Sequence, residues 1–308
     1  MANTEIFVDS RADASPRSRS GSVARSVRDL VALTKPRITS LVLVTGAAGA
    51  CLAPGHVAAG RLLLSLVGTA LIVGSANALN MWWERDVDGL MARTRNRPLP
   101  AGRMSPDTAL LFGLALGAVA TPLLFLVNVT TGLLGLLALV SYVAVYTPLK
   151  RHTHFALLVG ALPGAIPPLL GWSTATGTIG LGGLLLFAVL FLWQVPHFAA
   201  ITIFRAQDYA RAGLQVVSVQ KGEHGARRTI ALWTVLLVAS SLLFYPLGIA
   251  GRTSFGVATA LGVGFLALGF RGLLGGSFDV PRWAKRVFAY SIPYLCVLLV
   301  ALLLDRTR

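Results

Sequence analysis

The sequence has little charge, because Asp, Glu, Lys and Arg together make up only 13% of its 308 residues. Average soluble domains carry about 25%. Cysteine is almost absent, and Cys51 and Cys296 both lie inside apolar runs, which excludes a disulfide framework and a paired-cysteine metal site. Hydrophobic residues reach 55% and the mean hydropathy is +0.71. A chain this poor in charge cannot cover a soluble globule, so the sequence predicts an integral membrane protein.

Long apolar runs dominate the rest of the chain, and each is long enough to cross a bilayer as a helix. The nine runs are 38–54, 62–81, 108–127, 131–148, 155–172, 179–202, 229–249, 255–274 and 287–304. They predict an all-α polytopic protein with about nine transmembrane helices in one bundle, which forms a single domain over 38–308. The Ser- and Arg-rich segment 1–37 has no signal-like apolar run, and we expect it to be a disordered tail.

The net charge of +15 is distributed unevenly between the two ends of the expected bundle. With nine spans, 22 basic residues fall on the side of the N-terminus and four on the other side. The positive-inside rule therefore predicts a cytoplasmic N-terminus and a location in a bacterial plasma membrane. The partner of this positive charge is then expected to be the lipid bilayer and not nucleic acid. The two long, charged loops, after the second and sixth spans, place the chemistry on the cytoplasmic side.

The first of these loops begins with three oxygen-bearing side chains in a row. Asn80, Glu84 and Asp88 are spaced i, i+4, i+8, so on a continuing helix they share one face, whereas Asp86 points elsewhere. Mg²⁺ takes oxygen ligands and is held by one or two carboxylates together with substrate phosphates. The spacing therefore predicts a magnesium site at the cytoplasmic end of the second span.

Three arginines, Arg93, Arg95 and Arg97, follow this row of acids. Their forked donors suit phosphate oxygens, so the loop is typical of a site for a magnesium diphosphate. A solvated helix end with ordinary positive-inside arginines explains the same residues, and spacing alone does not separate the two interpretations.

The second loop and its neighbours supply further polar candidates. Gln194, His197, Arg205 and Asp208 lie at the cytoplasmic end of the sixth span, and Lys150 ends the fourth. A histidine at this depth binds a ligand or is a hydrogen-bonded core residue, and the second role is the more common. The loops share an Arg-x-x-Asp fragment, which suggests an internal duplication. Two glycines and three prolines in 160–168 predict an irregular span that lines a cavity.

These residues resemble the intramembrane prenyltransferases of the UbiA type. The family's motif NxxxDxxxD matches Asn80, Glu84 and Asp88, with glutamate in place of the first aspartate. The sequence is most similar to the branch that farnesylates haem, and three stretches carry that similarity: TKPR at 34–37, YTPLKR and its continuation at 146–172, and WQVPHF with IFRAQDYARAG at 193–213. The second acidic motif of general family members is reduced to Asp208.

The resemblance implies that the chain transfers farnesyl from farnesyl diphosphate to a vinyl group of haem B, with addition of water, to give haem O for terminal oxidases. It implies Mg²⁺ as the cofactor, held by Asn80, Glu84 and Asp88, with Asp208 supporting a second metal through water. It places Arg93, Arg97, Lys150 and Arg205 at the diphosphate and His197 and Gln194 at the haem, and it makes haem A synthase or oxidase assembly factors candidate partners.

Three alternatives to haem farnesylation stay open on the sequence. A prenyltransferase for an aromatic quinone precursor would use the same acids. A secondary transporter would also have apolar spans and internal repeats, but with polar groups near mid-span. A scaffold without catalysis would tolerate changes at Asp88.

Overall fold

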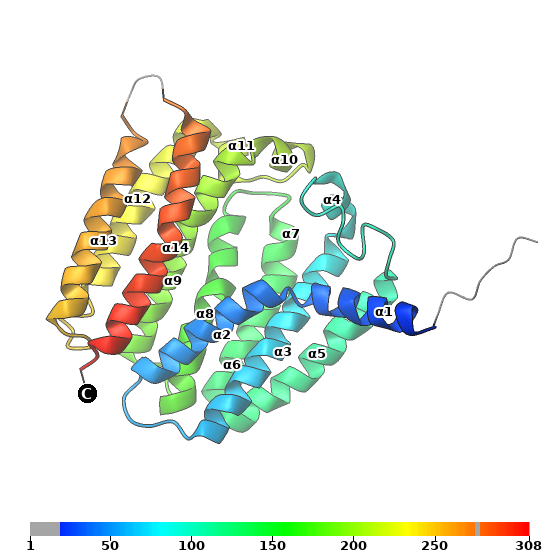
Figure 1. Cartoon of the computed structure of the whole chain (residues 1–308), viewed down its shortest axis with the longest axis horizontal. Coiled ribbons are helices and arrows are strands. Elements are labelled where there is room, and N and C mark those ends of the chain that lie inside the picture. Colours follow the sequence, from blue (N-terminus) through cyan, green and yellow to red (C-terminus); the bar gives the residue numbers. More distant parts are fainter. Residues whose placement is uncertain (1–18, 275–277, 308) are drawn as a thin grey trace, which may run out of the picture.

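The computed structural model describes residues 19–274 and 278–307, and Figure 1 shows them as a bundle of helices. The helices are α1 (Arg19–Leu33), α2 (Pro36–Leu52), α3 (Ala59–Trp83), α4 (Arg85–Leu90), α5 (Pro106–Val127), α6 (Val129–Val140), the π-helix η1 (Ser141–Tyr146), α7 (Thr147–Leu149), α8 (Ala156–Thr176), α9 (Leu181–Phe204), α10 (Ala206–Arg211), α11 (Val217–Gln220), α12 (Gly222–Leu242), α13 (Arg252–Arg271) and α14 (Val280–Leu304).

Local sequence signals explain where several of these helices begin and end. The Ser105 hydroxyl accepts from the Thr108 amide, and the Asn128 side chain accepts from the Thr131 amide, so each caps the helix that follows it. Gly177, in the left-handed region at φ 76°, ends α8. Inside the apolar runs the backbone N–H and C=O groups hydrogen-bond to each other within a helix, because a bilayer offers them no other partner.

The long helices confirm the all-α membrane fold. Among the described residues, seven helical segments are long and apolar enough to span a bilayer, one of them the continuous segment Val129–Leu149 made of α6, η1 and α7. Residues Arg25–Leu33 of α1 and helix α2, which meet at 47°, form an eighth candidate as a bent pair. The seventh predicted span corresponds to α12, which is less apolar because Arg227 and Arg228 lie near its N-terminal end. The count of nine and the cytoplasmic N-terminus stay predictions.

The helices form two groups that meet at α8 and α9. On one side α3 packs against α5, and α5 against α6; on the other, α12 and α14 pack against α9, and α13 packs against α12 and α14 (Figure 1). The largest core cluster lies in the second group and includes Trp193, Phe265 and Tyr294. Helix α2 packs against α8 and so closes one side of the interior between the groups.

Two sequence predictions about local structure are wrong. Residues 19–33, expected in a disordered tail, form helix α1, which is anchored because Leu33 is fully buried and Asp29 pairs with Arg103 at 3.2 Å. Residues 1–18 of that predicted tail lie outside the described residues. The proline-rich span is a continuous helix, α8, and the irregular segment is η1 instead, but α8 does line a cavity as predicted. Prolines are tolerated inside a membrane helix where neighbouring helices pack closely around the backbone groups that the prolines leave without a helical hydrogen bond.

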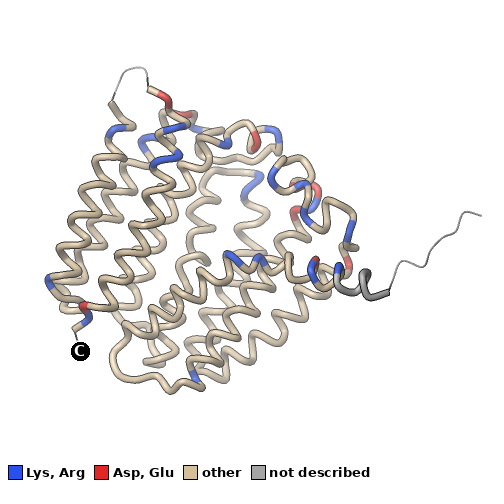
Figure 2. Tube along the Cα trace, in the orientation of Figure 1, with Lys and Arg blue, Asp and Glu red and all other residues tan. Residues whose placement is uncertain are grey.

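The two long loops lie at one end of the bundle and contact each other. Val87 and Met91, in and after α4, pack with Ala212 and Leu214, which follow α10. Both α4 and α10 are six-residue helices that directly continue a long helix, which is consistent with the suggested duplication. Figure 2 shows that most charged residues gather at this end, while few lie at the opposite one.

Candidate active site

A cavity of about 620 Å³ opens beneath the two packed loops. One part of its wall is polar and carries most of the predicted site residues. Another part is apolar and includes Ile72, Val73, Leu139 and Pro167. A polar end joined to an apolar interior suits a ligand with a charged group and a hydrocarbon chain.

The predicted row of oxygen donors is assembled as its spacing requires. Asn80 is 2%, Glu84 6% and Asp88 2% exposed, and all three line the cavity. The helix breaks at Glu84, but the Glu84 amide still donates to Asn80 O at 3.0 Å and the Asp88 amide to Glu84 O at 2.8 Å. Because these i to i−4 bonds survive the break, the three side chains keep one face.

Asp86 lies off this face, as expected, with a side chain that is 81% exposed.

Each buried acid is neutralised by one basic side chain. Lys150 Nζ lies 2.7 Å from both carboxylate oxygens of Glu84, and Arg97 Nη1 lies 2.6 Å from Asp88 Oδ2. Buried charges need such partners, because an unpaired one is strongly destabilising in a low-dielectric interior. Two of the predicted diphosphate ligands therefore contact the predicted metal ligands directly.

Two other predicted diphosphate ligands, Arg93 and Arg205, also line the cavity. The exposed Arg205 side chain lies 3.7 Å from the half-buried Asp208, one turn away. The four basic side chains come from two loops and a helix end, so only the packing of those segments brings them together.

The structure does not bring Asp208 into the row of oxygen donors. Its carboxylate pairs with Arg205 and Arg211, and it is not among the residues that line the cavity. Within 19–274 and 278–307, no three His, Cys, Asp or Glu side chains come close enough to hold a metal ion. The donors that the row offers are one amide and two carboxylates, a set that fits Mg²⁺ completed by phosphate oxygens and water.

His197 lies behind the cavity wall rather than in it. Its Nδ1 is 2.7 Å from Ser291 Oγ, and its ring stacks on Trp193 and packs against Phe288. Phe288 lines the cavity and His197 does not, so Phe288 belongs to the wall and His197 to the layer behind it. This environment favours the hydrogen-bonded core histidine over the predicted haem contact.

Gln194, the other predicted acceptor residue, does line the cavity and is held in one orientation. Its Nε2 donates to Ala161 O at 2.9 Å and to Leu190 O at 3.1 Å, so the amide oxygen points away from these carbonyls. A β-carbon on Gly164 would come within 2.1 Å of Oε1, which places this oxygen against the glycine. Gln194 is thus an oriented polar group beside the apolar part of the cavity.

Sequence reasoning missed three residues that line the polar end. Lys35 Nζ donates to Asn80 Oδ1 at 3.2 Å, and Tyr142 and Tyr146 of η1 form another part of the wall. Spacing could have found the tyrosines, because Tyr142, Tyr146 and Lys150 also follow an i, i+4, i+8 pattern. Lys35 had no such signal, since its contact with Asn80 joins segments that are far apart in the sequence.

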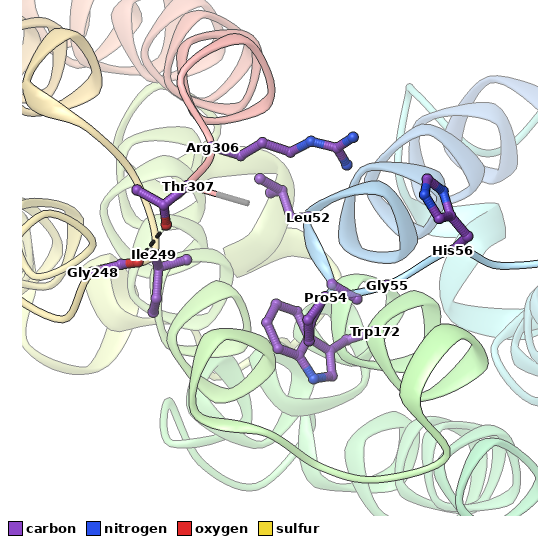
Figure 3. A pocket seen from close by; sticks show the side chains of 10 residues that line it. Leu52, Pro54, Gly55, His56, Trp172, Gly248, Ile249, Arg306 and Thr307 are labelled. Carbon is purple, nitrogen blue, oxygen red and sulfur yellow. Dashed lines mark hydrogen bonds between the residues drawn. The ribbon is translucent and has the colours of Figure 1, made fainter.

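A second cavity, of about 390 Å³, lies at the opposite end of the bundle near the C-terminus (Figure 3). Leu52, Trp172 and Ile249 form much of its wall, with His56 and Arg306 as its ionisable groups. Among the described residues that line it there is no Asp or Glu, so it lacks the acids that the predicted metal site requires.

Sequence comparison relates this chain to a known family and to named proteins. The model of the UbiA prenyltransferase family matches residues 42–303. A protoheme IX farnesyltransferase of Myxococcus xanthus is 50% identical over 293 residues, which cover 94% of this chain and 98% of the relative.

Solved structures share the fold at low sequence identity. A structure described as digeranylgeranylglyceryl phosphate synthase superposes with a TM-score of 0.79 at 14% identity, over 91% of this chain and 98% of that one. A UbiA homologue from Archaeoglobus fulgidus, bound to GPP and Mg²⁺, superposes with a TM-score of 0.61 at 16% identity, over 89% and 99%.

Proposed function

This chain belongs to the UbiA prenyltransferase family, and from that premise we propose that it farnesylates haem B, taking farnesyl from farnesyl diphosphate and adding water to give haem O. The family membership makes it a prenyltransferase. Relatives that match nearly its whole length carry the name protoheme IX farnesyltransferase, which supports haem as the acceptor. The observation that carries the proposal is the buried row of Asn80, Glu84 and Asp88 at the mouth of an apolar cavity.

The three oxygen donors are proposed to hold Mg²⁺. Magnesium is found in related structures of the family, and the amide and two carboxylates on this wall are ligands that it prefers. When bound, the ion would act as a Lewis acid that draws charge from the leaving diphosphate. The ion, and with it the charge that develops on the diphosphate, would thus be held at one end of the cavity by Asn80, Glu84 and Asp88.

The basic side chains are proposed to bind the diphosphate. Arg93, Arg97, Lys150 and Arg205 line the cavity around the row of acids, so they can donate to phosphate oxygens from several sides. Charge on the leaving group grows as the carbon–oxygen bond breaks, and cations placed beforehand stabilise that charge more than they stabilise the substrate.

The apolar wall is proposed to hold the farnesyl chain and shield the reacting carbon. The bond between farnesyl C1 and the diphosphate oxygen breaks, and a haem vinyl carbon forms the new carbon–carbon bond to C1. Water then adds its oxygen to the neighbouring vinyl carbon and releases a proton, while diphosphate leaves. Exclusion of bulk water keeps the allylic cation from reacting too early, and Gln194 offers an oriented polar atom for the acceptor.

The membrane location follows from the apolar helices, and the side on which the site lies is part of the proposal. The cavity mouth lies at the end where basic residues gather, so the positive-inside rule supports a cytoplasmic site in a bacterial plasma membrane. Acids gathered at one mouth also favour an enzyme over a transporter, which needs a site reachable from both sides.

Product analysis tests this function directly. We expect the purified protein in detergent, given haem B, farnesyl diphosphate and Mg²⁺, to convert haem B into a haem heavier by one farnesyl group and one hydroxyl group. Extracted haems are separated by chromatography and identified by mass. Removal of Mg²⁺ with EDTA is expected to stop the conversion, and its restoration to recover it.

Other acceptors decide between the remaining possibilities. Unchanged haem together with prenylation of an aromatic acid would contradict haem as the acceptor and leave the diphosphate chemistry in place. No product with any acceptor would contradict the enzymatic proposal as a whole.

A further inference from the structure

Three basic side chains contact the three proposed metal ligands, one on each. Lys35 lies 3.2 Å from Asn80 Oδ1, and the two closer pairs are those of Lys150 with Glu84 and Arg97 with Asp88. At least one oxygen of each ligand thus already contacts a protein cation, and Glu84 Oε2 also accepts from the Asn80 amide at 2.8 Å. A metal ion that binds these oxygens competes with those contacts.

The three cations come from separate parts of the chain, and all of them line the cavity. Lys35 lies between α1 and α2, Arg97 in the loop after α4, and Lys150 after α7. Lys35 has φ 49°, the only positive φ at a non-glycine position among the described residues. Such backbone costs about 1 kcal/mol or more and persists where the surroundings hold it in place. The residue with this strained backbone conformation is the lysine that contacts Asn80.

The charges at this wall do not balance. Five Lys and Arg side chains line the cavity against two carboxylates, so the site carries an excess of positive charge before any metal binds. A free divalent cation entering it adds to that excess and meets repulsion across a low-dielectric interior. A diphosphate carries more negative charge than one divalent cation neutralises, so a metal–diphosphate complex brings the charge that the three cations need.

We propose that Lys35, Arg97 and Lys150 act as stand-ins for the metal and pass from the ligand oxygens to the diphosphate oxygens when the complex enters. The site therefore takes up the metal–diphosphate complex in preference to the free metal. Lys35 becomes a diphosphate-binding residue alongside those already proposed. This inference rests on the proposed function for the metal and the diphosphate, but it does not depend on the acceptor.

Metal binding without substrate tests the exchange. Mn²⁺ serves as the probe, and its free concentration is followed by electron paramagnetic resonance with the purified full chain in detergent. Removing a stand-in cation frees a ligand, so we expect Lys150→Met to bind Mn²⁺ at least about tenfold more tightly than the wild type. Arg151→Met is the matched control, because it removes the same charge from an exposed neighbour. It is expected to stay within about twofold.

A second variant and a second probe allow the test to be read even if Lys150→Met fails to fold. Lys150→Met leaves Glu84 buried without its partner and risks unfolding, whereas Lys35→Met frees only the neutral amide of Asn80. Lys35→Met is expected to raise Mn²⁺ affinity in the same direction. The wild type is expected to bind preformed Mn²⁺–pyrophosphate more tightly than Mn²⁺ alone.

The outcomes separate this inference from the proposed function. If both lysine variants bind Mn²⁺ no more tightly than the wild type, the exchange is overturned, even if haem is farnesylated. Equal affinity of the wild type for Mn²⁺ and for Mn²⁺–pyrophosphate would overturn it too. If the variants gain affinity while no farnesylated haem is formed, the exchange stands and the proposed acceptor fails.

Discussion

Asp88→Asn is expected to lower kcat/KM for farnesyl transfer by at least about 1,000-fold, equal to about 4 kcal/mol of transition-state stabilisation. Asp88 is 2% exposed, lines the cavity and contacts Arg97, so its carboxylate acts at the proposed metal and diphosphate site. The amide is nearly the same size and leaves the packing in place, but it carries no negative charge for a metal. Initial rates of haem conversion at several Mg²⁺ concentrations measure the effect.

Asp86→Asn is the matched control for this substitution. It makes the same chemical change two residues away on the same short helix, at a side chain that is 81% exposed. We expect it to retain activity within about twofold, because an exposed charge is screened by solvent. An Asp88→Asn enzyme that stays magnesium-dependent with near wild-type rates would contradict the assignment of the site.

Gly171→Ala is expected to have the largest effect on folding. Its β-carbon would lie 1.8 Å from Gly46 O, and a β-carbon on Gly49 would lie 2.0 Å from Pro168 O. These contacts are to backbone, which cannot rotate away, so α2 and α8 would have to separate. Overpacking of this kind costs about 3 kcal/mol or more, and small residues at such interfaces are what allow two helices to approach closely.

Thermal unfolding in detergent, followed by the fraction that stays monodisperse after heating, measures this loss. Gly256→Ala is the control, because it lies within helix α13 with nothing within 4 Å of the added carbon. It is expected to leave the transition unchanged or raise it slightly, since alanine favours the helix. Equal transitions for the two variants would contradict a close α2–α8 contact.

Separation of α2 from α8 would also distort the proposed active site. Lys35 directly precedes α2, and the Gly160–Pro167 stretch of α8 forms part of the cavity wall. Folded Gly171→Ala protein is therefore expected to be less active than its folded fraction alone predicts.

Short-range periodicity was enough to predict that three oxygen-bearing side chains of the proposed site share one face. Asn80, Glu84 and Asp88 share a face because helical geometry repeats every 3.6 residues, and the break at Glu84 did not disturb the bonds that maintain this repeat. The apolar runs likewise predicted the long helices, since a bilayer leaves the backbone no other way to satisfy its hydrogen bonds.

Long-range contacts were beyond the same reasoning. Lys35 with Asn80 and Lys150 with Glu84 join segments 45 and 66 residues apart, and no local pattern encodes such pairs. His197 and Asp208 looked like site residues because they are polar and near the right end of a span. Packing places His197 against Ser291, whereas Asp208 pairs with Arg205 and Arg211, each only three residues away in the sequence.

The sequence by itself determined that the chain is a helical membrane protein with a row of oxygen donors at one helix end. Hydropathy and helical spacing are local properties, and they act before any two helices meet. The tertiary structure alone decided that Lys150 neutralises Glu84, that Lys35 contacts Asn80, and that His197 lies behind the cavity wall. Those outcomes depend on how α2, α8 and the two loops pack, because side chains from distant segments interact only after that packing has formed.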